Sequence, residues 1–270
     1  MTGGAFSSWR AFWHFRREVA RERRFIRTPS TELFLASVAA TLQSRVREIP
    51  VGWLAWRAQL GNDWRYEDSI SDEVPSAYPP PRMKPLTDRA YEGRANPKGI
   101  PCLYLATSEL TAISEVRPWI GSYVSVGQFR TTKSVRVVDC SQHQPRHPVF
   151  FKEPAPRQRE QAVWAHINSA FAEPVTRSDD TAEYVATQIL AELFRDQGYD
   201  GVAYKSAFGE DGHNVALFDI ECAHLLNCTL HQVDGVTCRY SQADNTYFVT
   251  AEGLVRNVIT AVLPMSSGTQ

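Results

Sequence analysis

The chain has 270 residues, of which 43% are hydrophobic and 11% aromatic, and its formal net charge is −1 at pH 7. This length fits one large domain or one domain with an extension, and the apolar content excludes a disordered chain. The balanced charge gives no argument for binding to nucleic acid or to a membrane. The five cysteines are an odd number, and the chain shows neither a signal peptide nor a long apolar run. We therefore expect a cytoplasmic protein with reduced thiols.

The first fifty residues differ from the rest in charge. Residues 1–50 hold nine arginines and four glutamates, a net charge of about +5, whereas the remaining residues are acidic. Their pattern predicts a helix over about 7–25 and a second helix over about 29–48, capped by Thr28 and followed by Pro50. The first helix would gather apolar side chains on one face: Trp9, Phe12, Trp13, Val19 and Ala20. We expect this face to dock on the rest of the protein, with residues 1–50 forming a basic helical extension and 51–270 the main domain.

From Val51 onward, short strands and helices alternate. The pattern predicts strands over 51–59, 101–107, 123–129, 134–140, 199–208 and 214–220, and helices over 109–117, 157–173 and 181–197. The proline-rich stretch 71–89 is expected to be a surface loop, and Asp234-Gly235 is a hairpin signal in a C-terminal part that is mostly β. Strands come in pairs as often as they alternate with helices. The sequence therefore predicts an α+β fold with a mixed sheet core and flanking helices.

A turn, a strand and a helix in succession suggest the site. In YEGRANPKGIPCLYLATSELTAISEV (91–116), Arg94 lies in a glycine- and proline-containing turn, and Glu115 lies among apolar residues of the predicted helix. A half-buried arginine and glutamate one strand–helix step apart point to an anionic ligand and a developing positive charge. His213, in a predicted turn, is a weaker candidate for a base.

Other chemistries find less support. The sequence contains no glycine-rich phosphate loop and no nucleophile elbow. Five residues with metal-binding side chains fall close together: Cys222, His224, Cys228, His231 and Cys238. Their spacing matches no zinc motif, and alternation along a strand would point them to different faces, so we expect no metal site.

Several stretches resemble the successive motifs of the RES domain family: WLAWRAQ, GRANPKGIPCLYLATSELTAISEV, and TAEYVATQILAELFRDQGYDGVAYKSA with NVALF. The resemblance covers roughly residues 50–220. It implies a fold like that of ADP-ribosylating toxins and an NAD⁺-degrading toxin of a bacterial toxin–antitoxin pair. It further implies cleavage of NAD⁺ by phosphate to ADP-ribose 1″-phosphate and nicotinamide. NAD⁺ and phosphate would then be substrates, no cofactor would be bound, and a helix-turn-helix antitoxin would block the active site.

The family's functional positions fall on six residues of this chain. The resemblance implies catalytic roles for Arg94, Glu115 and Ser206, and NAD⁺-binding roles for Arg57, Tyr104 and Asn214. Arginines suit a pyrophosphate or phosphate, and a carboxylate suits the cationic ribose that forms when nicotinamide leaves. The segment 60–90 is proline-rich here, a departure from the family pattern that leaves open whether it covers the pocket.

Alternatives remain open from the sequence alone. Glu115 could be half of a structural ion pair with Arg94 or Arg117, and Tyr104 an ordinary core residue. The same pocket could serve a protein ADP-ribosyltransferase or an NAD⁺ glycohydrolase, although Ile113 stands where such transferases often have a glutamate or glutamine. A non-catalytic binding module would instead use its basic helices to contact nucleic acid or a partner. The role of the helical extension in autoinhibition, dimerisation or delivery is likewise undecided.

Overall fold

The structure is a computed structural model that describes residues 6–87, 89–142, 150–173, 181–208, 212–238, 240–242, 247–250 and 253–256. The chain divides into two compact units, Met1–Asp234 and Gly235–Gln270. In the second unit, strand β11 (Tyr247–Thr250) pairs antiparallel with β12 (Gly253–Arg256).

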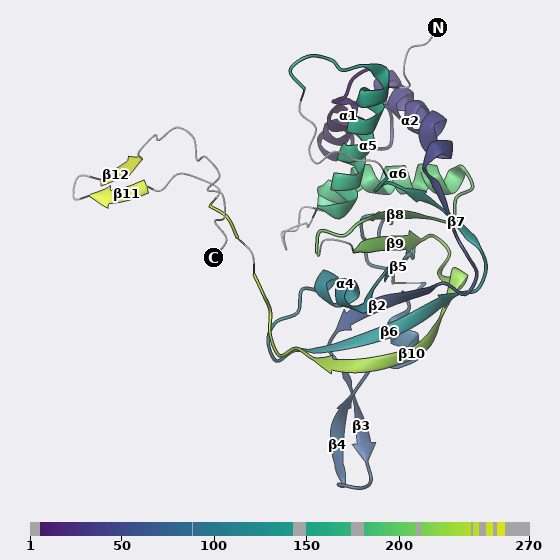
Figure 1. Cartoon of the computed structure of the whole chain (residues 1–270), viewed down its shortest axis with the longest axis vertical. Coiled ribbons are helices and arrows are strands. Elements are labelled where there is room, and N and C mark those ends of the chain that lie inside the picture. The colour runs from purple at the N-terminus through teal and green to yellow at the C-terminus, as the bar shows by residue number, and fades with distance from the viewer. Residues whose placement is uncertain are drawn as a thin grey trace, which may run out of the picture. The chain divides into compact units, whose positions relative to one another are not determined.

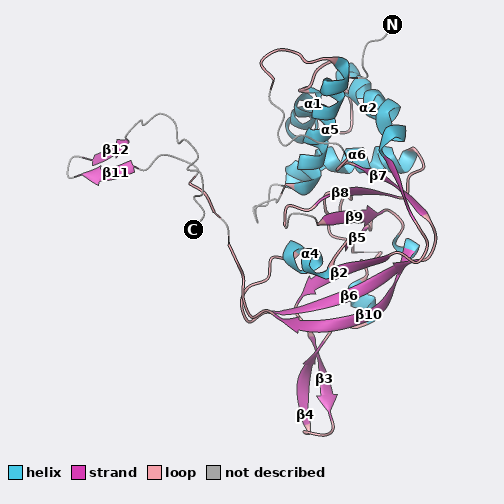
Figure 2. Ribbon diagram, in the orientation of Figure 1, coloured by secondary structure: helices cyan, strands magenta, loops and turns pink. Residues whose placement is uncertain are grey.

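An eight-stranded sheet forms the centre of the first unit (Figure 1). Its strands, in spatial order, are β1 (Val46–Ile49), β7 (Val135–Asp139), β8 (Gly201–Lys205), β9 (His213–Leu217), β5 (Leu103–Ala106), β2 (Leu54–Leu60), β6 (Tyr123–Thr131) and β10 (Ala223–Gln232). Only β7 and β8 pair in parallel, and all other neighbours are antiparallel. With helices gathered beside this mixed sheet, the α+β prediction is confirmed (Figure 2).

Four helices build one of the two apolar cores against the sheet. They are α1 (Ala11–Arg21), α2 (Pro29–Thr41), α5 (Pro156–Ala172) and α6 (Val185–Asp196), the last preceded by the 3₁₀ turn η2 (Thr181–Tyr184). Trp164 of α5 is fully buried among them, and its indole donates a hydrogen bond to Thr41 Oγ1 (3.1 Å). The second core lies under β2, β5, β6 and β9 and includes Leu103, Phe129 and Leu217.

Helix α1 docks on the body, as the sequence predicts, but with a different set of side chains. Phe12, Phe15 and Val19 are buried in the helical core, whereas Trp13 is 49% exposed. The period of 3.6 residues places Phe15 beside Phe12 and Val19 and turns Trp13 outward. The expected face was therefore wrong in detail: Phe15 belongs to it and Trp13 stands at its edge.

The second predicted helix was too long. Helix α2 ends at Thr41, a 3₁₀ turn (Leu42–Arg45) follows, and the remaining residues form β1, which pairs antiparallel with β7. β-Branched Val46 and Ile49 suit an edge strand, and pairing with β7 decides their conformation over local helix propensity. At the other end the prediction holds, because Thr28 Oγ1 accepts from the Thr31 N–H (3.2 Å) and Pro29 is the first helical residue.

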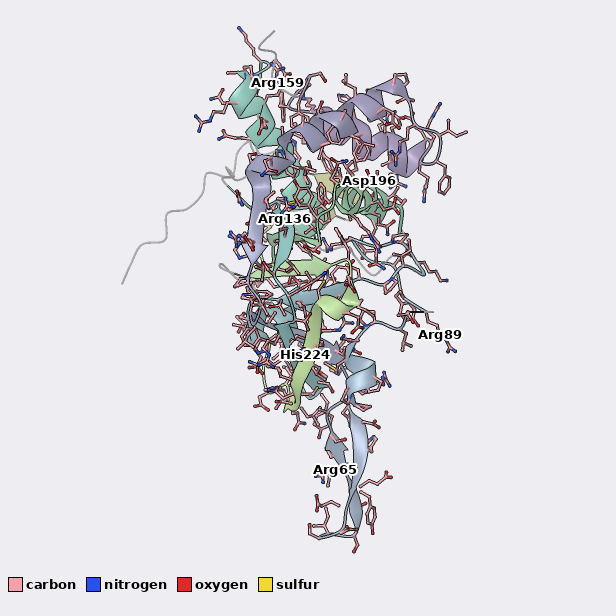
Figure 3. All side chains as sticks on the ribbon, turned by 90° about the vertical axis from the view of Figure 1, so that its right-hand side faces the viewer. Arg65, Arg89, Arg136, Arg159, Asp196 and His224 are labelled. Carbon is pink, nitrogen blue, oxygen red and sulfur yellow. The ribbon has the colours of Figure 1, made fainter. Side chains whose placement is uncertain are left out.

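The proline-rich stretch is partly ordered rather than a plain loop. Strands β3 (Asp63–Glu67) and β4 (Asp72–Ser76) form a hairpin, and a short helix α3 (Pro80–Met83) follows. The hairpin projects beyond the main sheet, with Arg65 midway along it and Arg159 at the opposite end of the unit (Figure 3). The loop prediction for 71–89 was wrong over β4 and α3, because pairing with β3 makes 72–76 a strand in spite of Pro75, and Pro80 begins a short helix.

The hairpin predicted at Asp234-Gly235 is also wrong. Strand β10 ends at Gln232 and pairs only with β6, and residues 233–238 belong to no strand. Residues 209–211 of the predicted GEDGHN turn lie outside the described residues.

Among the described residues, no helix has the length and apolar character needed to cross a membrane.

Candidate active site

The sheet is weakly joined between β5 and β2, and a cavity opens at this seam. A single residue pair, Trp56 with Ala106, links the two strands, whereas β2 and β6 share seven. The cavity holds about 300 Å³ and is lined by β2, β5 and β9, by the turn around Arg94, and by helix α4 (Glu109–Glu115). Five of the six predicted residues line it: Arg57, Arg94, Tyr104, Glu115 and Asn214.

Glu115 is the last residue of α4, and two side chains hold one of its oxygens. Ser108 caps the N-terminus of α4, and its hydroxyl accepts from the Thr111 N–H. Glu115 Oε1 accepts from Ser206 Oγ at 2.7 Å and from Asn214 Nδ2 at 2.5 Å. Oε2 makes no hydrogen bond or ion pair with any described residue. The carboxylate is thus oriented by one oxygen and open to a ligand through the other.

Ser206 stands behind the glutamate rather than in the cavity wall. It follows β8, is 4% exposed, and is absent from the cavity lining. Its hydroxyl donates to Glu115 and accepts from the Phe208 N–H (3.0 Å), so its hydrogen-bonding capacity is largely used within the protein. In this structure the serine contacts the carboxylate.

Arg94 is held by a turn with several internal hydrogen bonds. The Gly93 N–H donates to the Asn96 carbonyl (2.9 Å), and Gln188 of α6 donates to the carbonyls of both Gly93 and Asn96. Arg94 Nη1 donates to the Phe171 carbonyl near the end of α5 (2.6 Å). Because the last carbonyls of a helix carry partial negative charge, this contact fixes the guanidinium without neutralising it.

Tyr104 of β5 supports the same turn. Its hydroxyl accepts from the Ala95 N–H (2.8 Å) and donates to Asn96 Oδ1 (2.7 Å). Burial raises the pKa of this phenol well above its ordinary value, so the hydroxyl remains a donor at neutral pH. One face of the tyrosine lines the cavity while its hydroxyl braces the Arg94 turn.

Arg57 of β2 is a cation with no counter-charge among the described residues. Its Nε is buried and has no hydrogen-bond partner, and the guanidinium forms no ion pair with any described residue. Burial lowers the pKa of Arg57, opposed mainly by Tyr104. A partly desolvated guanidinium at a cavity wall is costly unless an anion binds there. Arg57 therefore marks the anion-binding side of the cavity.

Three aromatic lining residues escaped the sequence analysis: Trp56, Tyr184 and Tyr204. Trp56 precedes Arg57 in β2, and Tyr184 ends η2. Tyr204 is buried in β8 and stacks on Phe171 with ring centroids 5.5 Å apart. Strand alternation gives a signal for Tyr204, which lies two residues before Ser206, but nothing in the local sequence places Tyr184 near the seam.

The ion pair considered for Glu115, the candidate base His213 and the Cys/His cluster can each be located in the described part of the chain. Glu115 forms no ion pair with Arg94 or Arg117 among the described residues, and the Arg117 guanidinium instead lies over the Phe208 ring, 5.6 Å from its centroid. His213 does not line the cavity. No group of three or more metal-binding side chains occurs within the described ranges.

Comparisons with known proteins give a family and a structural relative. The family model described as "RES domain" matches residues 54–239, more than half of the chain. A chain in the crystal structure of the M. tuberculosis MbcT–MbcA toxin–antitoxin complex aligns with 15% sequence identity and a TM-score of 0.41. The alignment covers 72% of this chain and 92% of that one. No curated protein sequence matches. The extent of the family match shows that the chain belongs to the RES domain family.

Proposed function

We propose that this protein cleaves the nicotinamide–ribose bond of NAD⁺ and transfers the ADP-ribosyl group to inorganic phosphate. The observation that carries the proposal is the hydrogen bonding of the two carboxylate oxygens of Glu115. One carboxylate oxygen is held by Ser206 and Asn214, and the other is unpaired among the described residues at a cavity that also contains two arginines. Membership in the RES family supports the same reading.

The chemistry needs few groups. Nicotinamide leaves NAD⁺ with the electron pair of the C1–N bond, which turns the pyridinium into a neutral ring, so no general acid is required. Positive charge develops on the ribose, and the carboxylate of Glu115 stabilises it. A phosphate oxygen then forms the new bond to C1, and the products are nicotinamide and ADP-ribose 1″-phosphate.

The two arginines suit the anionic groups of the substrates. Arg57 has no counter-charge among the described residues. Arg94 donates from Nη1 to the Phe171 carbonyl, so its other N–H groups remain available to a ligand. Guanidinium groups bind phosphate oxygens through two parallel hydrogen bonds. One arginine holding the pyrophosphate and the other the attacking phosphate fits this arrangement.

The aromatic wall suits the leaving group. The cavity is lined by four aromatic residues, Trp56, Tyr104, Tyr184 and Tyr204, and aromatic side chains suit contact with a flat heteroaromatic ring. Glu115 lies on the same cavity, so a nicotinamide ring against this wall would bring the bond to be broken toward the carboxylate.

In a cell, depletion of NAD⁺ would stop growth, so we propose that the protein acts as a toxin controlled by a protein antitoxin that blocks this cavity. Family membership supports this role. Induced expression in a bacterial host should arrest growth and lower intracellular NAD⁺, whereas the Glu115→Gln variant should do neither.

The decisive experiment is incubation of the purified protein with NAD⁺, with and without phosphate, followed by NMR of nicotinamide and of the ribosyl product. Nicotinamide release that requires phosphate and falls about a thousandfold in Glu115→Gln is expected. Release without phosphate would indicate hydrolysis, and ADP-ribose attached to protein would indicate a transferase. No release under any condition would overturn the enzymatic proposal and favour a binding module.

A further inference from the structure

We propose that Arg16, on helix α1 and outside the RES match, is a positioning residue of the active site. It joins the C-terminal end of α5 to the η2 turn. The end of α5 orients the Arg94 side chain, and η2 carries Tyr184, which lines the cavity. This inference rests on the proposed function for its kinetic test. The structural part of the test does not depend on that function.

Arg16 lies between two glutamates. Its Nη1 and Nη2 both lie 3.3 Å from Glu173 Oε2, and Nη2 also donates to Glu183 Oε2. Arg21, five residues further along α1, adds a contact from Nη2 to Glu183 Oε1 (3.0 Å). The Arg16 side chain is 32% exposed and that of Glu183 28%, so the central pair is partly shielded from water. One guanidinium thus bridges the end of α5 and the η2 turn.

The Glu173 end of this bridge leads to the guanidinium of Arg94. Glu173 caps the C-terminus of α5, and its N–H donates to the Ser169 carbonyl. Two residues before it, the Phe171 carbonyl accepts the 2.6 Å hydrogen bond from Arg94 Nη1. Movement of the end of α5 would therefore move the group that orients the Arg94 side chain.

The Glu183 end leads to the cavity wall and to the backbone of the same turn. Glu183 precedes Tyr184, which lines the cavity. The Tyr184 carbonyl accepts from Thr187 Oγ1 (2.9 Å) in the first turn of α6. The next residue, Gln188, donates to the carbonyls of Gly93 and Asn96 on either side of Arg94. The Arg94 side chain is thus held by the end of α5, and the backbone of its turn is held by α6, which directly follows η2. Arg16 joins these two parts of the chain.

Charge explains why the bridge affects position more than stability. Removing Arg16 leaves Glu173 and Glu183 facing each other across the space that the guanidinium filled, and like charges repel. Partly exposed ion pairs contribute little to folding free energy. Helix α1 itself is anchored by buried Phe12, Phe15 and Val19, so the helix should remain docked without Arg16.

The kinetic test compares Arg16→Ala with Arg17→Ala. Arg17 belongs to the same helix, its side chain is 79% exposed, and it pairs with Glu22 at 3.7 Å, so it controls for loss of a positive charge. Because Glu115 is held by Ser206 and Asn214 and not by this bridge, Arg16→Ala should raise KM for NAD⁺ about tenfold and change kcat less than about twofold. Arg16→Lys should restore part of the loss, and Arg16→Glu should deepen it.

The structural test is hydrogen–deuterium exchange of the same full-length variants without substrate. Amides in residues 91–97 and 182–190 should exchange faster in Arg16→Ala than in the wild type, and Arg17→Ala should match the wild type. Unchanged exchange in both segments, or equal effects of the two variants, would overturn the role of Arg16. If the wild type does not turn over NAD⁺, the proposed function fails, and the exchange result still decides whether Arg16 positions these segments.

Discussion

Ser206 and Glu115 are 91 residues apart in the sequence, and the serine hydroxyl donates a 2.7 Å hydrogen bond to one oxygen of the carboxylate. Asn214, from the adjacent strand β9, donates to the same oxygen. Two neutral donors on one oxygen orient the carboxylate without cancelling its charge, which an arginine or lysine partner would do. The arrangement suits a group whose task is to stabilise positive charge on a substrate.

Removing either donor should therefore lower turnover. Ser206→Ala and Asn214→Ala are each expected to reduce kcat for nicotinamide release by about 10- to 100-fold, because Glu115 loses part of its orientation. Since both act on one oxygen, the double variant should lose less than the product of the two single effects. Steady-state kinetics with thermal unfolding as a control for folding would measure this, and strictly multiplicative losses would contradict it.

We expect Arg57 to lower the free energy of unfolding and to raise the affinity for NAD⁺. Its guanidinium is half-buried with no counter-charge among the described residues, and burial lowers its pKa. Arg57→Met keeps the apolar stem and removes the desolvated charge, so the free energy of unfolding should rise by about 1 kcal/mol. Affinity for NAD⁺ should fall at least about 100-fold.

Arg65→Met is the matched control for Arg57, because its side chain is 64% exposed and pairs with Glu67 at the surface. Denaturant titration and calorimetric NAD⁺ binding would measure both quantities. A destabilised Arg57→Met protein with unchanged affinity would show that the arginine serves the fold instead.

Gly93 should tolerate no side chain. A Cβ built there would lie 2.5 Å from the Tyr104 hydroxyl and 3.0 Å from Asn96 Oδ1. Gly93→Ala should therefore displace the tyrosine and shift Arg94, with KM for NAD⁺ rising about tenfold or more. Gly235→Ala is the control, since its Cβ has no neighbour within 4 Å. Equal kinetics in the two variants would mean that the turn adapts without moving Arg94.

Cys102 should make the fold sensitive to alkali. The thiol is 3% exposed and contacts the Leu217 carbonyl, and burial raises its pKa from 9.0 to about 12. Since the folded-state pKa lies above the unfolded one, this contribution is complete below pH 9.0 and is lost as pH rises toward about 12.

In that window the free energy of unfolding should fall by up to about 1.4 kcal/mol per pH unit from this group. Tyr104 and Tyr204, whose pKa values burial also raises, add to the wild-type loss. The comparison with Cys102→Ala isolates the thiol, and the stability gap between the two proteins should be constant below pH 9.0 and narrow as the pH rises above it. A gap that stays constant in urea titrations would contradict the assignment.

Local sequence predicted those parts of the fold whose signals are local. Ser108 as a cap marked helix α4, Thr28-Pro29 marked the start of α2, and alternating apolar residues marked β6. It failed where pairing with a distant strand decided the conformation. Val46–Ile49 is a strand because it pairs with β7. Asp234-Gly235 forms no hairpin because the preceding strand, β10, pairs with β6.

The same division holds for the site. The sequence by itself determined which functional groups the site contains. Arg94, Tyr104 and Glu115 lie within one turn–strand–helix stretch, and their residue types already suit an anionic substrate and a cationic transition state. Only the tertiary structure decided how these groups work. The single residue pair between β5 and β2 opens the cavity, strands β8 and β9 bring Ser206 and Asn214 to Glu115, and helices α5 and α6 hold Arg94. Such contacts join residues up to about a hundred positions apart, and no local propensity encodes them.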